Sequence, residues 1–282
     1  MSLASFFPDL SSDPSDDRAI ATRKAIKFLA KLALALRNSG HPELNTIELV
    51  AGSLVKEQQV VDRDIRVRII DPQKAEENII ENLLQVLTGI RYRPNDTPLT
   101  FALEIAPGPL LAINSFDAID KFCSSLDRKQ NEVLNNRCLK DVGINLDIAH
   151  WNIVMHNDVE LIKARFTPND ILNELRRKCT GKYYHIFRRI CHSHISGYHQ
   201  AAHFGDLPII CDVYPTPPIM NKWDASFSGW INLLKERMQD QQDNINQYTG
   251  QPKYSGYIIC ELEATANTKN VTDTIETLIN NL

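Results

Sequence analysis

The stretch VGINLDIAHW, residues 142–151, decides the fold of this chain. Its apolar residues alternate with Gly143, Asn145 and Asp147, and a period of two predicts a buried β-strand with two different faces. A carboxylate on the inward face of a strand is costly to desolvate unless it is paired or bound to a cation. Asp147 therefore indicates a functional site at the C-terminal end of this strand, where His150 offers a second ligand type.

Strand patterns and helix patterns alternate on both sides of this stretch. Apolar residues with a period of two, or in short runs, predict strands at 2–7, 45–51, 99–105, within 184–195, at 207–213 and at 256–263. Apolar residues on one helical face predict helices at 18–37, 72–87, 116–136, 168–179, 226–241 and 271–282. Residues 56–71 interrupt the alternation, and DIRVRII at 64–70 is typical of a β-ribbon.

Alternating strands and helices predict a parallel sheet with helices outside it. With about seven strands in such a sheet, we expect one α/β domain over 1–282, folded as a (β/α) TIM-type barrel. A barrel of this type needs about 250 residues, which the chain provides. No G-x-G-x-x-G or P-loop motif follows a predicted strand, and this disfavours an open nucleotide-binding sheet.

The composition is typical of a globular protein, with 43% apolar and 23% charged residues. The net charge of -4 gives no broad positive field, so nucleic acid is disfavoured as a partner. The 6 cysteines form no C-x-x-C pair, which favours reduced thiols and a cytoplasmic location. Neither a secretory signal nor an apolar run long enough to span a membrane is present, so we expect no membrane partner.

Ionisable groups stand at four predicted strand ends, namely Glu104, Asp147 with His150, His194 and Glu261. In an α/β barrel the C-terminal ends of the strands converge on one mouth, so these side chains could meet there. Three carboxylates with one or two imidazoles suit a hard to borderline divalent cation better than a structural zinc, which prefers thiolates. We expect one divalent cation, which is Mn²⁺, Mg²⁺, Co²⁺ or Zn²⁺.

Each of these residues also has an ordinary structural interpretation. A single Glu at a strand end is more often solvated or in a salt bridge than functional, and D-x-x-H is a common chance pattern. His192 shares a strand face with His194, so we expect it one layer deeper, as a packed or hydrogen-bonded residue. Glu263 lies one step beyond Glu261 on the same face, at the rim. Four such strand ends in order favour the functional interpretation over the ordinary one.

The order of these motifs resembles a known family. A Glu, then D-x-x-H, then H-I-S, then a Glu in a Y-x-x-x-E-x-E strand is similar to the xylose-isomerase-like TIM barrels, specifically the sugar phosphate isomerase/epimerase group. The resemblance covers about 47–282 and is strongest over 142–151, 190–206 and 256–263. The segment HFGDLPI at 203–209 also resembles that family's loop after the sixth strand.

The resemblance implies a role for each motif residue. The metal ligands would be Glu104, Asp147, His194 and Glu261, with Glu104 and Glu261 also the acid/base pair. The substrate would contact His150, His192, His203 and Glu263. The implied reaction is metal-dependent isomerisation or epimerisation of a small sugar, sugar phosphate or polyol, in which a proton moves next to a polarised carbonyl. The assembly state, including a homo-oligomer, stays open.

Two residues and the N-terminal segment depart from the family pattern. Gln200 stands where the ketose epimerases carry an Arg, and Gly197 stands where an Asp is common. Only 2–7 is available before the helix at 18–37, where the family has two strands, so we expect a barrel that is short or incomplete at the N-terminus. These departures keep open a non-catalytic or diverged member of the same barrel family.

Two further activities use the same barrel. A dehydratase would rely on closely related chemistry. An apurinic-type endonuclease would need extra histidines on early strands and an Asp-x-His motif after the sixth strand. Here VAGSL at 50–54 has no His, and Ala201 stands two residues before His203. Together with the net negative charge, this disfavours the nuclease.

Overall fold

A computed structural model of the chain describes residues 2–5, 9–61, 64–94, 96–132, 137–158, 162–163, 165, 167–177, 181–195, 197–199, 202–207, 227–243, 252–255, 258–260, 272–273, 275–276 and 279–280. Glu261 and Glu263 lie outside these residues. So does most of the apolar run predicted as a strand at 207–213.

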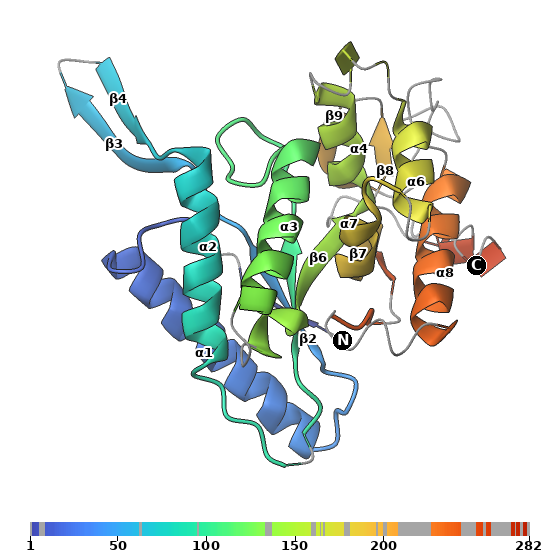
Figure 1. The fold of residues 1–282 in the computed structure, drawn as a ribbon, viewed down its shortest axis with the longest axis horizontal. Coiled ribbons are helices and arrows are strands. Elements are labelled where there is room, and N and C mark those ends of the chain that lie inside the picture. The colour runs from blue at the N-terminus through green and yellow to red at the C-terminus, as the bar shows by residue number, and fades with distance from the viewer. Residues whose placement is uncertain are drawn as a thin grey trace.

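Parallel strands form the central sheet, which lies behind the helices in Figure 1. In spatial order the strands are β1 (Ser2–Ser5), β2 (Thr46–Val50), β5 (Thr100–Glu104), β6 (Val142–Asp147), β7 (Ile190–Ile195) and β10 (Ile259–Cys260). Every neighbouring pair is parallel. Because the spatial order equals the chain order, the sheet is wound in one direction, as in a β/α barrel, and lacks the reversal of a doubly wound sheet.

Helices connect these strands, as the alternating pattern predicts. They are α1 (Asp17–Asn38), α2 (Pro72–Leu87), α3 (Phe116–Glu132), α4 (Ile148–Asn157), α6 (Pro168–Arg176), α7 (Tyr184–Arg189) and α8 (Phe227–Asp243), with a 3-10 turn at Arg137–Asp141. Helix α1 packs beside α2, and α3 packs beside α7 (Figure 1). Asp71 starts α2 by accepting a hydrogen bond from the Gln73 backbone, with Pro72 in the first turn, where its missing N–H costs nothing.

Two antiparallel hairpins leave this pattern. The first joins β3 (Val55–Val61) to β4 (Asp64–Ile69) and projects from one corner of the molecule (Figure 1), which confirms the predicted β-ribbon. The second joins β8 (Gly197–His199) to β9 (Ala202–Leu207) in a segment where the sequence predicts only a loop. The short alternation around Gly197 carries too little apolar pattern to show a strand.

The strand predicted within 184–195 is shorter than the pattern indicates. Its first residues, YHIFRR, form α7, and β7 begins at Ile190. Short apolar runs do not separate a buried helix from a buried strand, and here Ile186 and Phe187 face the core from a single helical turn. The second half, ICHSHI, is a strand buried along its whole length.

Strand β6 confirms the period-two pattern and is buried on both faces. Its start is fixed by Arg189, whose buried guanidinium donates to the carbonyls of Leu139 and Val142 at 3.0 and 2.8 Å and pairs with Asp127. Gly143 is required here because a Cβ atom would lie 2.4 Å from the Arg189 carbonyl oxygen. The stretch therefore has no room to shift against β7.

The end of β6 differs from the prediction in one respect. The strand stops at Asp147, and Ile148 already belongs to α4. The Asp147 carboxylate accepts a hydrogen bond from the His150 backbone at 2.8 Å and so caps the helix. His150 consequently lies in the first turn of a helix and not on the strand. None of the helices among the described residues has an apolar stretch long enough to cross a bilayer.

Candidate metal centre

The register of the sheet places the predicted site residues side by side. Glu104 on β5 pairs with Asn145 on β6, and Asp147 on β6 pairs with His194 on β7. All of these positions lie at the C-terminal ends of parallel strands. This is the edge of a β/α barrel on which active sites form.

Three of the four predicted metal ligands converge. One ligand atom each from Glu104, Asp147 and His194 lies within 4.8 Å of the other two. Asp147 is fully buried and His194 is 4% exposed, while Glu104 is half-buried. Two ligand atoms bound to one cation at about 2.1 Å are at most about 4.2 Å apart, so a small side-chain movement closes the set around an ion. The residues present thus fit a divalent cation.

His150 lies next to these carboxylates. Its Nδ1 atom is 3.0 Å from Oε1 of Glu104 and 3.9 Å from Oδ2 of Asp147. The following residue, Trp151, is fully buried and packs edge-on against Phe116, with ring centroids 6.0 Å apart. The core thereby anchors α4 and fixes the direction from which the imidazole approaches Glu104.

A residue that the sequence interpretation missed, Glu48 on β2, joins the same region. Its carboxylate reaches across the sheet to β7, with Oε1 3.1 Å from Nε2 of His192 and Oε2 3.0 Å from Nε2 of His194. Ala102 and Gly143 occupy the aligned positions on the two strands between. The signal was present, because a Glu inside the apolar strand TIELV has no ordinary reason to be buried.

The two histidines of β7 are held from both sides. Nδ1 of His194 lies 3.3 Å from Nδ2 of Asn145. Nδ1 of His192 lies 3.0 Å from the hydroxyl oxygen of Ser255. The two rings meet edge to face, 5.4 Å between centroids. His192 is 1% exposed and His194 is 4% exposed, so both imidazoles are buried.

Other predicted site residues are not placed by the structure. Glu261 and Glu263 lie outside the described residues. The backbone of His203 belongs to β9, but its side chain is outside the described part of the chain. The roles of these three residues stay predictions from the family resemblance.

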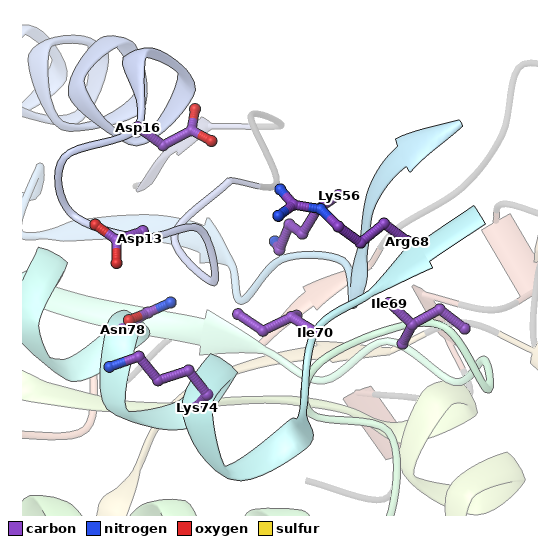
Figure 2. A pocket seen from close by; sticks show the side chains of 8 residues that line it. All are labelled: Asp13, Asp16, Lys56, Arg68, Ile69, Ile70, Lys74 and Asn78. Carbon is purple, nitrogen blue, oxygen red and sulfur yellow. The ribbon is translucent and has the colours of Figure 1, made fainter. Parts of the chain in front are cut away.

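A cavity of about 240 Å³ lies apart from this centre, at the base of the β3–β4 hairpin (Figure 2). It is lined among others by Asp13, Asp16, Lys56 and Arg68, which come from the first loop and the hairpin. The Lys56 ammonium donates to the Ser53 carbonyl at 2.6 Å, and burial lowers the pKa of Lys56 to about 8. Among the residues that the structure describes, the cavity shares no lining residue with the candidate metal centre.

Comparisons with known proteins find relatives in structure but not in sequence. No family model and no curated protein sequence matches the chain. The crystal structure of the IolI protein with a bound zinc atom matches with a TM-score of 0.53 and 13% identity, over 99% of this chain and 74% of that one. The 3-keto-D-glucoside 4-epimerase YcjR from E. coli, in its apo form, matches with a TM-score of 0.51 and 14% identity, over 99% of this chain and 78% of that one. These matches confirm the TIM-barrel fold that the sequence predicts.

Proposed function

We propose that the chain is a divalent-metal-dependent isomerase or epimerase that acts on a small sugar or sugar derivative. The observation that carries the proposal is the convergence of Glu104, Asp147 and His194 at the C-terminal edge of the sheet. The two structural relatives support it, since one binds zinc and the other is a sugar 4-epimerase.

The cation would be held by Glu104, Asp147 and His194, and by Glu261 on the family resemblance. When bound, a divalent cation polarises a substrate carbonyl and so acidifies the hydrogen on the neighbouring carbon. Two carboxylates and an imidazole accept Mn²⁺, Co²⁺ and Zn²⁺ as well as Mg²⁺. The fully buried carboxylate of Asp147 has a reason to be there in such a site, because a cation offsets its desolvation.

Glu104 would be the residue that moves the proton. It is the half-buried member of the group and therefore the one that a substrate can reach. One carboxylate oxygen faces Nδ1 of His150 at 3.0 Å, so the imidazole orients the carboxylate and can hold a substrate oxygen beside it. Glu261 would serve the opposite face of the substrate, where a second carboxylate makes the exchange an inversion.

The proposal is tested by following deuterium from solvent into sugars. Purified protein is stripped with a chelator, reloaded separately with Mn²⁺, Co²⁺, Zn²⁺ or Mg²⁺, and incubated in D₂O with a panel of ketoses, keto-glycosides and their phosphates. We expect proton NMR to show metal-dependent exchange at the carbon next to a carbonyl. The Glu104→Gln variant should lose it, while Glu77→Gln on the outer surface of α2 should keep it.

Absence of exchange with every metal and every substrate class would contradict the proposal. Metal binding without any exchange would then favour a diverged member of the fold that has lost catalysis, because the cation would be held but no proton would move.

A further inference from the structure

The carboxylate of Glu48 and the imidazoles of His192 and His194 form a second group at this edge of the sheet. One ligand atom from each lies within 4.8 Å of the others, and all three side chains are buried. The group shares only His194 with the set around Glu104. It therefore offers a cation a place that the proposed mechanism does not use.

The distances within this group are those of ligands already gathered. In a tetrahedral site, oxygens and nitrogens each about 2.1 Å from the cation are about 3.4 Å apart. The two separations from the Glu48 carboxylate, 3.1 Å from Oε1 to His192 Nε2 and 3.0 Å from Oε2 to His194 Nε2, are a few tenths of an ångström below this value. The carboxylate and both imidazoles would hardly move to receive an ion.

The imidazole of His192 supplies an independent observation. Its Nε2 atom is buried and makes no hydrogen bond of acceptable geometry with any described residue, although Glu48 Oε1 is only 3.1 Å away. If the Nε2 lone pair and the Glu48 carboxylate both pointed at one cation, the two atoms would lie this close without forming a hydrogen bond to each other. Its other nitrogen, Nδ1, faces the Ser255 hydroxyl at 3.0 Å, whose oxygen can accept the ring N–H, as the outer partners of metal-bound histidines do.

We infer that Glu48, His192 and His194 form an alternative position for a transition-metal cation, distinct from the one bounded by Glu104 and Asp147. Two imidazoles and one carboxylate favour Zn²⁺ or Co²⁺, whereas the carboxylate-rich set around Glu104 also accepts Mg²⁺ and Mn²⁺. Because His194 belongs to both sets, a cation in one position weakens the other. The chain can thus hold Zn²⁺ in a place that leaves Glu104 without its metal.

The test removes two ligands of the Glu104–Asp147–His194 set and measures whether a cation still binds to Glu48, His192 and His194. The double variant Glu104→Gln/Asp147→Asn keeps the shapes of both side chains, and Asn caps a helix as Asp does. We expect this variant to bind about one Zn²⁺ or Co²⁺ per chain, measured by metal analysis after gel filtration and by calorimetry with the metal alone. It should bind Mg²⁺ at least about tenfold more weakly than Zn²⁺.

Adding His192→Ala to the double variant should lower the Zn²⁺ affinity at least about tenfold. Adding His185→Ala should leave it unchanged, because His185 pairs with Asp120 on α3 at 2.8 Å. If the His192 variant does not fold, ring ¹⁵N NMR of the folded double variant decides, since Zn²⁺ should shift the nitrogens of both His192 and His194.

No Zn²⁺ or Co²⁺ bound by the folded double variant would overturn the inference, as would ring signals of His192 that do not move with metal. Glu48 would then be an ion-pair partner of two histidines and nothing more. Neither result bears on the isomerase proposal, which is tested on the unaltered chain by deuterium exchange.

Discussion

His150 Nδ1 lies 3.0 Å from Oε1 of Glu104, although the two residues belong to successive β/α units of the fold. The contact exists because Asp147 ends β6 and caps α4 through the His150 backbone, which sets the imidazole in the first helical turn. The Asp147 carboxylate thereby positions His150, the partner of the proposed base, and is also one of the proposed metal ligands.

From this contact we predict that Glu104 and His150 act as one unit. The Glu104→Gln variant should lose about 10²- to 10⁴-fold in kcat, the range for a lost acid/base group. His150→Gln should lose less, and the double variant should be no slower than Glu104→Gln alone, because its base is already absent. Steady-state kinetics of the three variants checks this. Additive losses would show that the two residues act separately.

Asp147 should carry two roles that different substitutions separate. Asp147→Asn keeps the helix cap, so the metal-free variant should unfold at nearly the wild-type denaturant concentration, while its metal affinity falls. Asp147→Ala also loses the cap and should be destabilised by about 1 kcal/mol more. Urea unfolding with chelator, together with calorimetric metal titration, measures both effects. Equal stabilities of the two variants would contradict the capping role.

The sequence predicted the scaffold well because its strands and long helices show regular periods of apolar residues. The alternation over 142–147 is strict, so the positions of Asn145 and Asp147 follow from the strand period alone. The long helices were predicted within a few residues for the same reason, since each buries one regular face. The C-terminal end of β6 was predicted less well. The sequence does not show whether Asp147 is the last inward-facing residue of the strand or the N-cap of the helix that follows.

The sequence shows Glu48 as a charged residue within an apolar strand, but it does not reveal the partners of its carboxylate. Its partners, His192 and His194, lie more than a hundred residues later, on a strand that two other strands separate from β2. No local pattern encodes such a reach across a sheet. The hairpin at β8–β9 was missed for a different reason, since its strands are too short to show a period.

Gly143 should tolerate no side chain. A Cβ atom there would meet the Arg189 carbonyl oxygen at 2.4 Å and Cys191 Sγ at 2.6 Å, and the backbone oxygen cannot rotate away. We expect Gly143→Ala to lower the free energy of unfolding by about 1–3 kcal/mol. Gly108→Ala is the matched control, because its nearest neighbour would be a Leu111 methyl at 3.4 Å. A Gly143→Ala protein as stable as the control would contradict this packing.

Asp141 should weaken the fold at neutral pH. Burial raises the pKa of its carboxyl to about 6, and Lys140 offsets this only in part. The folded state therefore holds the proton more tightly than the unfolded chain, and stability is lost as pH rises through 6. Asp141→Asn should be more stable by about 2 kcal/mol at pH 7.5, and the gain should vanish near pH 4. Urea unfolding of both proteins at pH 7.5 and pH 4 measures this change. An equal difference in unfolding free energy at the two pH values would contradict the prediction.

Lys56 should give the opposite pH dependence in the alkaline range. Burial lowers the pKa of its ammonium to about 8 from 10.5, so the unfolded chain binds more protons between these values and stability rises with pH. The difference in unfolding free energy between wild type and Lys56→Met should shift in favour of wild type from pH 8 to pH 10. Lys74→Met, at an exposed position on the same cavity, is the matched control (Figure 2).

An anomalous difference map from a crystal grown with Zn²⁺ or Mn²⁺ tests the central claim most directly. The account predicts a metal peak, in the Mn²⁺ crystal above all, bonded at about 2.0–2.2 Å to Glu104, Asp147 and His194 together. A Mn²⁺ map with no peak at the C-terminal edge of the sheet, or with peaks that touch neither Glu104 nor Asp147, would contradict it.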